Sequence, residues 1–244
     1  VCIVYCHTID EVFKSVGSGT AAYGVVPLEN STEGAISRTL DLLFEASLTL
    51  SGEVGLPVRH SLLSNEKPQD IETIFSHSQS LSQCQRWLGD NFPFAQLIPV
   101  ASNATAAKMV ASEERSAAIA SQIAGHHYGL SVLHSSIEDK PDNTTRFGVI
   151  SKSAVGASGI DKTSIVLAAQ HKPGAILNVL EPFAKSGISM TRLGSRPSGV
   201  GLWEDMFFIE LEGHQDDEVM KAALAEVQMK SGFFKILGSY PKTI

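Results

Sequence analysis

Residues 24–34 read GVVPLENSTEG, a short apolar run followed at once by a dense polar turn. Tyr23 to Val26 is aromatic and β-branched enough to predict a buried strand, which Pro27 is expected to end. Apolar residues at helical spacing then predict a helix over 35–45. The stretch therefore reads as a strand, a polar loop and a helix, which is the basic unit of an α/β fold.

Asn30 is predicted to cap that helix, and Glu33 follows at the spacing of a capping box. The simplest interpretation is that the turn only begins a helix. A single cap needs one side chain, however, whereas the five polar residues over 29–33 supply several donors and acceptors. Such loops are where α/β proteins place ligands, and the N–H groups of a helix end favour an anion. The stretch therefore indicates a binding site.

The composition is that of a globular protein with ample apolar residues for a core. Its 244 residues are 43% hydrophobic and 18% charged, and the formal net charge is −7. Because the cations are scattered, nucleic acid is not an expected partner. No apolar run reaches the roughly 18 residues of a membrane helix, and no signal peptide is apparent, so no membrane is expected either. Cys2, Cys6 and Cys84 lack metal-ligand spacing and are interpreted as reduced thiols of a cytoplasmic protein.

Strands and helices alternate through residue 134, which favours a mostly parallel sheet with helices outside, split into two lobes. Within this part, Val1 to Cys6 is predicted to be a strand and Ser80 to Asp90 a single helix. Residues 151–161, SKSAVGASGID, have no periodicity and are predicted to separate two domains. The remainder predicts the order βαββαβ, which is that of a ferredoxin-like sandwich.

Polar side chains gather in three predicted turns, at Glu29 to Glu33, Ser76 to Gln83 and Asn143 to Arg146. The ends of parallel strands can meet at one cleft, where these turns would supply hydroxyls, a carboxylate, amides and a cation. Taken alone, Arg146 is equally well interpreted as a surface cation. The combination, rather than any one turn, indicates a site for an anionic substrate.

Several common catalytic sites are not expected. His77 lies beside Ser76, but no G-x-S-x-G elbow is present, so a structural histidine is the simpler interpretation. No G-x-G-x-x-G or Walker sequence follows a strand, so no nucleotide cofactor is expected. The adjacent His126 and His127 would diverge on a helix, and no metal site is predicted.

Considered together, the three turns resemble the signature regions of the prephenate dehydratase family. The stretches, in the family's order, are GVVPLENSTEG at 24–34, SHSQSLSQCQRWL at 76–88 and NTTRF at 143–147. The remainder resembles the regulatory ACT domain of that family, with KPGAILNVLEPFAKSGI at 172–188 and SRP at 195–197. The resemblance implies an α/β catalytic domain over 1–151 with two lobes similar to type II periplasmic binding proteins and the active site between them, a linker over 152–161, and a ferredoxin-like ACT domain over 162–244.

The reaction of this family would account for the residue types. Prephenate carries two carboxylates and a ring hydroxyl; loss of CO₂ pushes electrons through the ring and expels the hydroxyl as water, which leaves phenylpyruvate. Aromatisation drives the reaction, so the resemblance implies no cofactor. The protein must supply a proton for the leaving hydroxyl, contacts for the carboxylates and the correct orientation.

The resemblance also assigns roles to particular residues. Thr145 is expected at the leaving hydroxyl, where it positions a proton. Arg146 and the helix end after Asn30 are expected to hold a carboxylate. The implied catalytic residues are Thr145, Glu29, Asn30 and Gln83, and the implied substrate-binding residues are Ser31, Thr32, Ser76, His77, Arg146 and Phe147.

Two motifs of the C-terminal part match the phenylalanine contacts of the family. They imply that L-Phe binds between paired ACT domains as a feedback inhibitor, in a homodimer or homotetramer. Without the family, the same residues would be interpreted as a helix start that needs small residues and as a turn that ends a strand. The residues are Gly174, Ala175, Ile176, Ser195, Arg196 and Pro197.

The sequence departs from the family pattern at several positions. The family begins with a strand and a Gly-Thr-Phe turn that are absent before Val1, so the catalytic domain is expected to be N-terminally incomplete. Ser78 stands where the family often has Pro, Gly194 where it has Glu, and Ser189 where it often has Asn. The last two lie near the expected effector site and leave the identity of the effector open. Two alternatives remain at this point: an arogenate dehydratase, and a non-catalytic amino-acid-sensing protein with the same folds.

Overall fold

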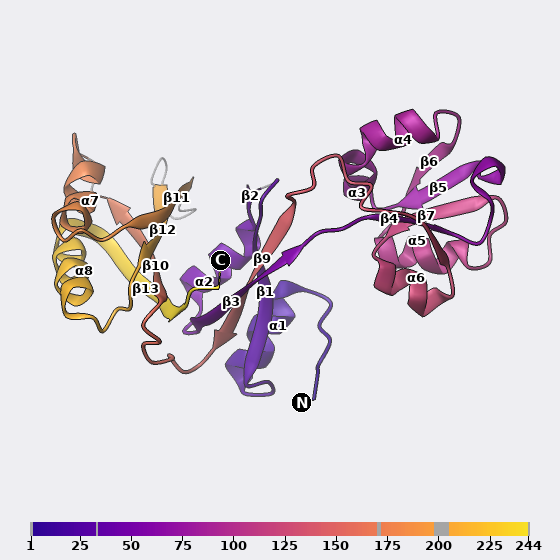
Figure 1. The fold of residues 1–244 in the computed structure, drawn as a ribbon. Helices are drawn as coiled ribbons and strands as arrows, with labels where there is room; N and C mark the ends of the chain where they lie inside the picture. Colours follow the sequence, from indigo (N-terminus) through magenta and orange to yellow (C-terminus); the bar gives the residue numbers. More distant parts are fainter. Residues whose placement is uncertain (1, 33, 170–171, 198–204, 244) are drawn as a thin grey trace. The chain divides into compact units, whose positions relative to one another are not determined.

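The computed structural model describes residues 2–32, 34–169, 172–197 and 205–243, and Figure 1 shows their fold. The chain forms two compact units, and each is described here by itself. The first unit combines residues 1–56 with 145–244, and the second holds residues 57–144. The chain therefore leaves the first unit once and returns to it.

The N-terminal half of the first unit is an antiparallel sheet with two helices. Its elements are α1 (Ile9–Ser18), β1 (Tyr23–Asn30), β2 (Gly34–Ala35), α2 (Ser37–Glu45), β3 (Thr49–Pro57) and β9 (Thr144–Ser151). The strands lie in the order β2-β1-β9-β3, and β1 is antiparallel to both β2 and β9. The side chain of Thr8 accepts the N–H of Glu11 and so caps α1, which buries Phe13 and Val16.

The C-terminal half of the first unit has the predicted order βαββαβ. Its elements are β10 (Asp161–Ala169), α7 (Ala175–Lys185), β11 (Met190–Pro197), β12 (Asp205–Glu212), α8 (Glu218–Lys230) and β13 (Ser231–Pro241). The strands lie in the order β11-β12-β10-β13, and every pair is antiparallel. The ferredoxin-like prediction for this part is thereby confirmed.

The C-terminal sheet is covered on both faces. Ile165 and Leu167 of β10 pack with buried residues of α7 and α8. Val166, which lies between them, packs instead with buried residues of α1, β1, α2 and β3. This follows from the strand itself, because successive side chains point to opposite faces. The two halves of the first unit therefore share one hydrophobic core.

Strands β13 and β3 approach each other closely at Gly238. A Cβ placed on Gly238 would clash with the carbonyl oxygen of Leu50, and the φ of Gly238, 151°, also favours glycine. Beside this position, Thr49 Oγ1 donates a hydrogen bond to the carbonyl of Leu237 at 3.0 Å. A glycine at 238 is therefore what allows the C-terminal sheet to pack directly on β3.

The second unit is a mixed five-stranded sheet with helices around it. Its elements are β4 (Ser61–Ser64), the 3₁₀ helix η1 (Pro68–Asp70), β5 (Thr73–Ser76), α3 (Ser78–Gln83), α4 (Gln85–Asn91), β6 (Gln96–Pro99), α5 (Asn103–Val110), β7 (Ser116–Ala120), α6 (Gln122–Tyr128) and β8 (Ser131–Ser135). The strand order is β6-β5-β7-β4-β8. Two buried clusters, one containing Leu62 and Ile74 and the other Leu63 and Phe75, lie against it.

The predicted mostly parallel sheet is wrong for both units. Parallel pairing joins β5 to β6 and to β7, whereas β4 is antiparallel to β7 and to β8. Parallel neighbours need a crossover, and helices lie between β5, β6 and β7 in the chain. Strand β4 follows β3 without a helix between them, and it lies between β7 and β8 in the sheet. It runs in the direction opposite to both of these neighbours.

Two expectations about the opening stretch are wrong. Strand β1 continues through Pro27, which lies opposite Phe147 beside a register shift where a missing N–H is tolerated. Helix α2 begins only at Ser37, with Ile36 at its N-cap, so Asn30 does not cap it. The intervening chain forms the β1–β2 hairpin instead, and no helix end follows Asn30 directly. Glu33, the expected capping-box partner, lies outside the described residues.

Two further expectations are corrected. The predicted helix over 80–90 is two short helices divided at Cys84. The Asp139 carboxylate accepts the N–H groups of Arg86 at 2.9 Å and Trp87 at 3.1 Å, which satisfies the first turn of the second helix. Residues 2–6 pair with no described strand and are not a strand themselves, because an extended segment needs a neighbour to take its hydrogen bonds.

Candidate functional site

The β1–β2 hairpin and the start of β9 bring four predicted site residues together in the first unit. Asn30 lies opposite Thr145 in the β1–β9 ladder, and Glu29 lies opposite Arg146. Gly34, at φ 86°, allows the chain to turn back along β1. These side chains are therefore neighbours although 115 positions separate Asn30 from Thr145 in the sequence.

The Asn30 side chain is held in one orientation. Its Oδ1 accepts the N–H of Thr32 at 2.9 Å, and its Nδ2 donates to Thr145 Oγ1 at 3.0 Å. Asn30 is buried, with 7% of its surface exposed. Because the amide occupies an acceptor position of the threonine oxygen, the Thr145 O–H is directed to donate its own hydrogen elsewhere. The pair is therefore suited to hydrogen bonding an oxygen that develops negative charge.

The other predicted substrate contacts of this unit lie around that pair. Ser31 and Thr32 are exposed at the tip of the hairpin, where their hydroxyls follow directly after Asn30. Phe147 is half-buried and lies opposite Pro27. Two hydroxyl side chains thus lie next to the Asn30–Thr145 pair in the sequence, and an aromatic side chain lies two residues beyond Thr145.

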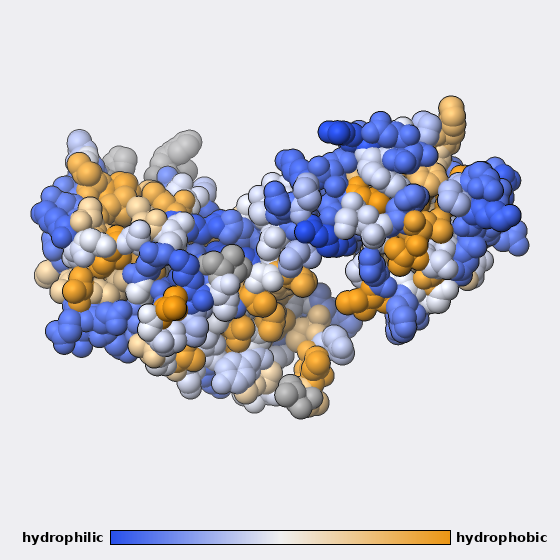
Figure 2. All heavy atoms as spheres, in the orientation of Figure 1, coloured by the Kyte–Doolittle hydropathy of each residue, from blue (hydrophilic) through white to orange (hydrophobic). Residues whose placement is uncertain are grey.

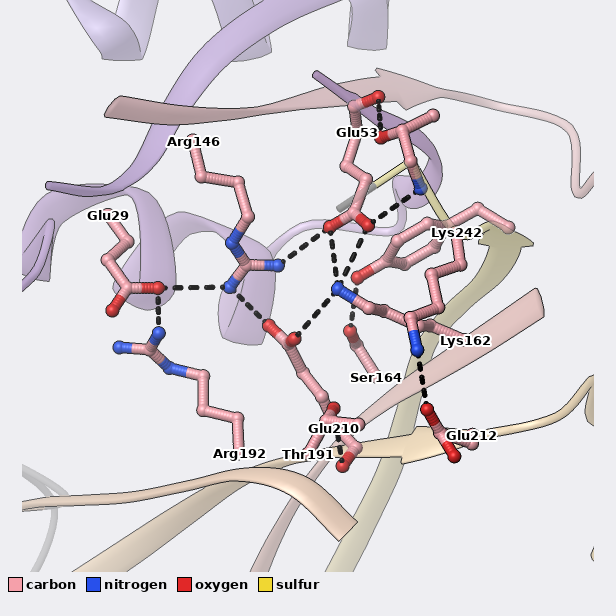
Figure 3. A network of polar contacts seen from close by, with 12 residues as sticks. Glu29, Glu53, Arg146, Lys162, Ser164, Thr191, Arg192, Glu210, Glu212 and Lys242 are labelled. Carbon is pink, nitrogen blue, oxygen red and sulfur yellow. Dashed lines mark hydrogen bonds and ion pairs between the residues drawn. The ribbon is translucent and has the colours of Figure 1, made fainter. Parts of the chain in front are cut away.

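Arg146 contacts three carboxylates (Figure 3). Its Nη1 donates to Glu53 at 2.9 Å, while its Nη2 donates to Glu210 at 2.5 Å and to Glu29 at 3.3 Å. Its side chain is 12% exposed. Burial lowers the pKa of Arg146, but the charge of Glu210 and the hydrogen bonds outweigh burial and raise it, so the guanidinium stays charged. The prediction that Arg146 binds a substrate carboxylate must therefore be weighed against these protein partners.

Glu53 is the most buried member of this group. Its side chain is fully buried and also pairs with Lys162 at 2.9 Å. Burial alone would raise the pKa of Glu53, but hydrogen bonds from Lys162, from Arg146 and from the backbone of Thr243 hold the pKa below the ordinary value of 4.5. The carboxylate is therefore ionised at neutral pH.

In the second unit, Ser76 ends β5 and is fully buried. Its Oγ lies 2.7 Å from the carbonyl of Ile119, to which it donates, and 2.9 Å from Asn103 Oδ1. The same Oδ1 accepts the N–H of His77 at 3.1 Å and the Oγ of Ser80 at 3.0 Å. Ser76 and Asn103 therefore join β5, β7 and the starts of α3 and α5.

Gln83 and His77 lie at opposite ends of α3. The Oε1 of Gln83 lies 2.8 Å from Nε2 of the buried His60, so that nitrogen carries the proton and donates. The backbone N–H of His60 donates in turn to Glu138 at 2.9 Å. His77 caps α3, since its Nδ1 accepts the N–H of Gln79 at 3.3 Å. A structural role for His77 is therefore visible.

Strand β11 carries the second predicted effector motif, Ser195, Arg196 and Pro197. Arg196 donates to the carbonyl of Ser37 at 2.6 Å and pairs with Asp41 at 2.9 Å, and both partners lie on α2. The motif is thus in direct contact with the helix that follows the β1–β2 hairpin.

Ser195 and Arg196 also line a cavity of about 580 Å³, a volume that includes its open mouth. Its walls are mostly apolar and come from both halves of the first unit. The first effector motif, Gly174, Ala175 and Ile176, begins α7, where Gly174 is the N-cap residue at φ 76°. These three residues do not line that cavity, so the described chain does not bring the two motifs together there.

Sequence reasoning missed several polar residues that hold the predicted ones. Glu53 and Glu210 contact Arg146 from 93 and 64 positions away in the chain, and His60 contacts Gln83. No local motif marks them. Glu53 lies between Gly52 and Val54 on β3, and Glu210 lies between Ile209 and Leu211 on β12, but a charged residue between nonpolar neighbours does not reveal its partner.

The described residues show no group of three or more His, Cys, Asp or Glu side chains that could hold a metal ion. None of the described helices is long and apolar enough to cross a membrane. Figure 2 shows apolar and hydrophilic surface interspersed on the face it presents. On the helices of the C-terminal half, Leu177 and Met229 are 72% and 79% exposed.

Comparison with known sequences gives matches over nearly the whole chain. A family profile described as "Prephenate dehydratase" matches residues 1–155, and one described as "ACT domain" matches residues 163–228. A bifunctional chorismate mutase/prephenate dehydratase of Pseudomonas aeruginosa is 47% identical over 238 residues. The match covers 97% of this chain and 65% of that relative, so this chain spans less than two thirds of the relative's length.

Two solved structures have the same fold over both units. A prephenate dehydratase of Arthrobacter aurescens in complex with L-Phe matches with a TM-score of 0.87 and 32% identity, over 97% of this chain and 80% of the other. GqqA, described as a novel type of quorum quenching acylase, matches with a TM-score of 0.86 and 28% identity, over 98% and 88%. The fold occurs with more than one named activity, so the activity of this chain has to be argued from its residues.

Proposed function

Because this chain belongs to the prephenate dehydratase family and has an ACT domain after its catalytic part, we propose that it converts prephenate to phenylpyruvate, water and CO₂. The observation that carries the proposal is the hydrogen bond from Asn30 to Thr145, which leaves a threonine O–H to donate beside the polar hairpin tip. No cofactor enters the reaction. The bond from the ring carbon to its carboxylate breaks, the electron pair enters the ring, and the ring hydroxyl takes up one proton and leaves as water.

Thr145 and Asn30 have distinct roles in this proposal. Thr145 donates its hydrogen bond to the oxygen of the leaving hydroxyl, and Asn30 orients the threonine oxygen. A threonine hydroxyl is a weak acid, so Thr145 does not stay deprotonated in the reaction. Its role is to align the proton that the leaving hydroxyl of prephenate receives. The hydroxyls of Ser31 and Thr32, exposed at the hairpin tip, offer donors to a substrate carboxylate. Gln83, Ser76 and His77 remain predicted contacts from the second unit.

We further propose that L-Phe regulates the chain. The Arthrobacter aurescens structure contains L-Phe, and Ser195 and Arg196 of this chain lie on the strand that contacts α2. The exposed apolar side chains of α7 and α8 support the predicted homodimer or homotetramer, in which Gly174, Ala175 and Ile176 of one subunit would complete the effector site of another. The three unpaired cysteines support a cytoplasmic location.

The proposal is tested by following phenylpyruvate formation in the ultraviolet after prephenate is added, and by repeating the assay with L-Phe. We expect turnover that L-Phe reduces. Equal or faster turnover of arogenate would assign the alternative, an arogenate dehydratase. No turnover of either compound together with L-Phe binding in equilibrium dialysis would assign an amino-acid sensor, whereas turnover without L-Phe binding would remove only the regulatory part.

A further inference from the structure

A buried network of ion pairs joins the two halves of the first unit (Figure 3). Besides Arg146, it contains Lys162 of β10, which lies 2.9 Å from Glu53 and 3.8 Å from Glu210. Arg192 of β11 pairs with Glu29. In Figure 3, Glu29 lies between the two arginines, and Glu210 reaches toward Arg146 and Lys162 from the C-terminal sheet.

The charges of this network balance. Its three carboxylates belong to Glu29, Glu53 and Glu210, and its three cations to Arg146, Lys162 and Arg192. The side chains of Lys162 and Glu210 are 7% and 13% exposed, so solvent screens these inner charges only weakly, whereas Glu29 and Arg192 are 22% and 30% exposed and are screened more. Loss of one inner member would therefore leave an uncompensated charge in a poorly hydrated place, and loss of Arg192 would leave one that is partly hydrated.

The network lies one residue from the Asn30–Thr145 pair on both strands. Glu29 precedes Asn30 on β1, Arg146 follows Thr145 on β9, and Glu29 and Arg146 face each other in the ladder. Any shift of Glu29 or Arg146 would therefore move the backbone that carries the reacting pair. Their remaining partners, Arg192 and Glu210, both come from the C-terminal sheet.

We propose that Arg192 and Glu210 are positioning residues of the dehydratase site, which hold Glu29 and Arg146 so that no net charge stands beside the Asn30–Thr145 pair. The inference rests on the proposed function. It makes the C-terminal sheet a structural part of the active site, and it gives Arg146 the role of a positioning residue in place of a substrate ligand. Because successive side chains point to opposite faces, the network lies on the face of β1 and β9 away from the Asn30–Thr145 pair, so the prephenate dianion meets a site with no net charge behind it.

The proposal predicts charge-dependent effects of opposite sign. Arg192→Gln leaves one negative charge beside the site, so the KM for prephenate should rise about five- to tenfold, and more at low salt. Glu210→Gln leaves one positive charge, so the KM should not rise and should fall at low salt. The double variant restores the balance and should return the KM to within about twofold of the unchanged chain. Arg192→Lys, which keeps the charge, should also stay close to the KM of the unchanged chain.

A matched control is Glu212→Gln, because Glu212 lies two residues from Glu210 on the same strand and pairs with Lys242 at a more exposed position. Its KM should be unchanged. If Arg192→Gln and Glu210→Gln shift the KM in the same direction and their effects add in the double variant, the network is only structural and the inference is wrong. If the unchanged chain does not turn over prephenate, the proposed function fails first, and this inference fails with it.

Discussion

The chemistry of Asn30 is constrained by two hydrogen bonds of its side chain. Its Oδ1 is occupied by the N–H of Thr32, so its Nδ2 must face Thr145. Asn30→Asp keeps the shape but replaces the donor by a carboxylate oxygen that can only accept. We expect the kcat for prephenate to fall about 10²- to 10³-fold, as for loss of one preorganised donor. Steady-state kinetics measures the effect, and a variant with normal kcat would exclude this role.

Glu53 gives the network a pH dependence. Its folded pKa is lowered, so its stabilising contribution is complete above the unfolded value of about 4.5 and is lost as the pH falls through the folded pKa. Glu53→Gln should lower the free energy of unfolding at pH 7 by about 3 kcal/mol, because two buried cations lose a partner. Urea unfolding of the unchanged chain and of the Glu53→Gln variant measures this difference in the free energy of unfolding. The difference should shrink as the pH is lowered below 4; an equal difference at both pH values would contradict the assignment.

The proposed reacting pair stands in sequence motifs, whereas the residues that support it have no such signal. Asn30 and Thr145 stand in two of the three polar turns that the sequence marks, and the resemblance to the family assigns the roles proposed for them. The partners of Arg146, namely Glu53 and Glu210, lie on strands that become neighbours only when distant parts of the chain fold together. Local periodicity carries no information about such pairs. The resemblance therefore predicts a substrate contact for Arg146 without any sign of its protein partners.

At the scale of elements, one lysine links the end of a helix to the C-terminal sheet. Lys235 Nζ donates to the carbonyls of Leu43 and Phe44 at 2.8 Å and of Ala46 at 2.6 Å, at the C-terminal end of α2. A cation at this end satisfies unpaired carbonyls and the helix dipole. Lys235→Met should therefore lower the free energy of unfolding by about 2 kcal/mol.

Chemical denaturation measures the effect of Lys235→Met, and Lys185→Met is its control. Lys185 pairs with Glu181 on an exposed face of α7, where solvent screens the pair and it contributes little to stability. Equal losses of stability in the two variants would show that the contacts of Lys235 with α2 stabilise the fold no more than an exposed ion pair does.

The order of elements follows well from sequence patterns, but strand ends and direction do not. The βαββαβ order of the C-terminal half is confirmed because each strand and helix there has its own periodicity. At Pro27 and Asn30, pairing with β9 and the β1–β2 hairpin override the local preference for a strand end and a helix cap. The direction of β4 is not predicted for the same reason, because β4 pairs with β7 and β8, which lie far away in the sequence.

At the scale of the whole molecule, the predicted domain boundary over 152–161 cuts through a shared core. Val166, Met206, Leu237 and Tyr240 of the C-terminal half belong to the buried cluster that also holds α1 and β1. A fragment of residues 1–155 would expose that cluster. The second unit, residues 57–144, stays whole in this fragment and keeps its own buried clusters. We therefore expect the fragment to keep only the thermal transition of the second unit and to bind a hydrophobic dye, whereas the full chain does not bind the dye. A fragment that binds no more dye than the full chain would contradict the shared core.

The central claim is that Thr145, oriented by Asn30, assists the loss of the ring hydroxyl of prephenate. The most direct measurement is the kcat for prephenate of Thr145→Ser and Thr145→Val, compared with the unchanged chain. Thr145→Ser keeps the hydroxyl and should retain kcat within about tenfold, whereas the nearly isosteric Thr145→Val should lose about 10²- to 10³-fold with little change in KM. Turnover of Thr145→Val at the rate of the unchanged chain would contradict the claim.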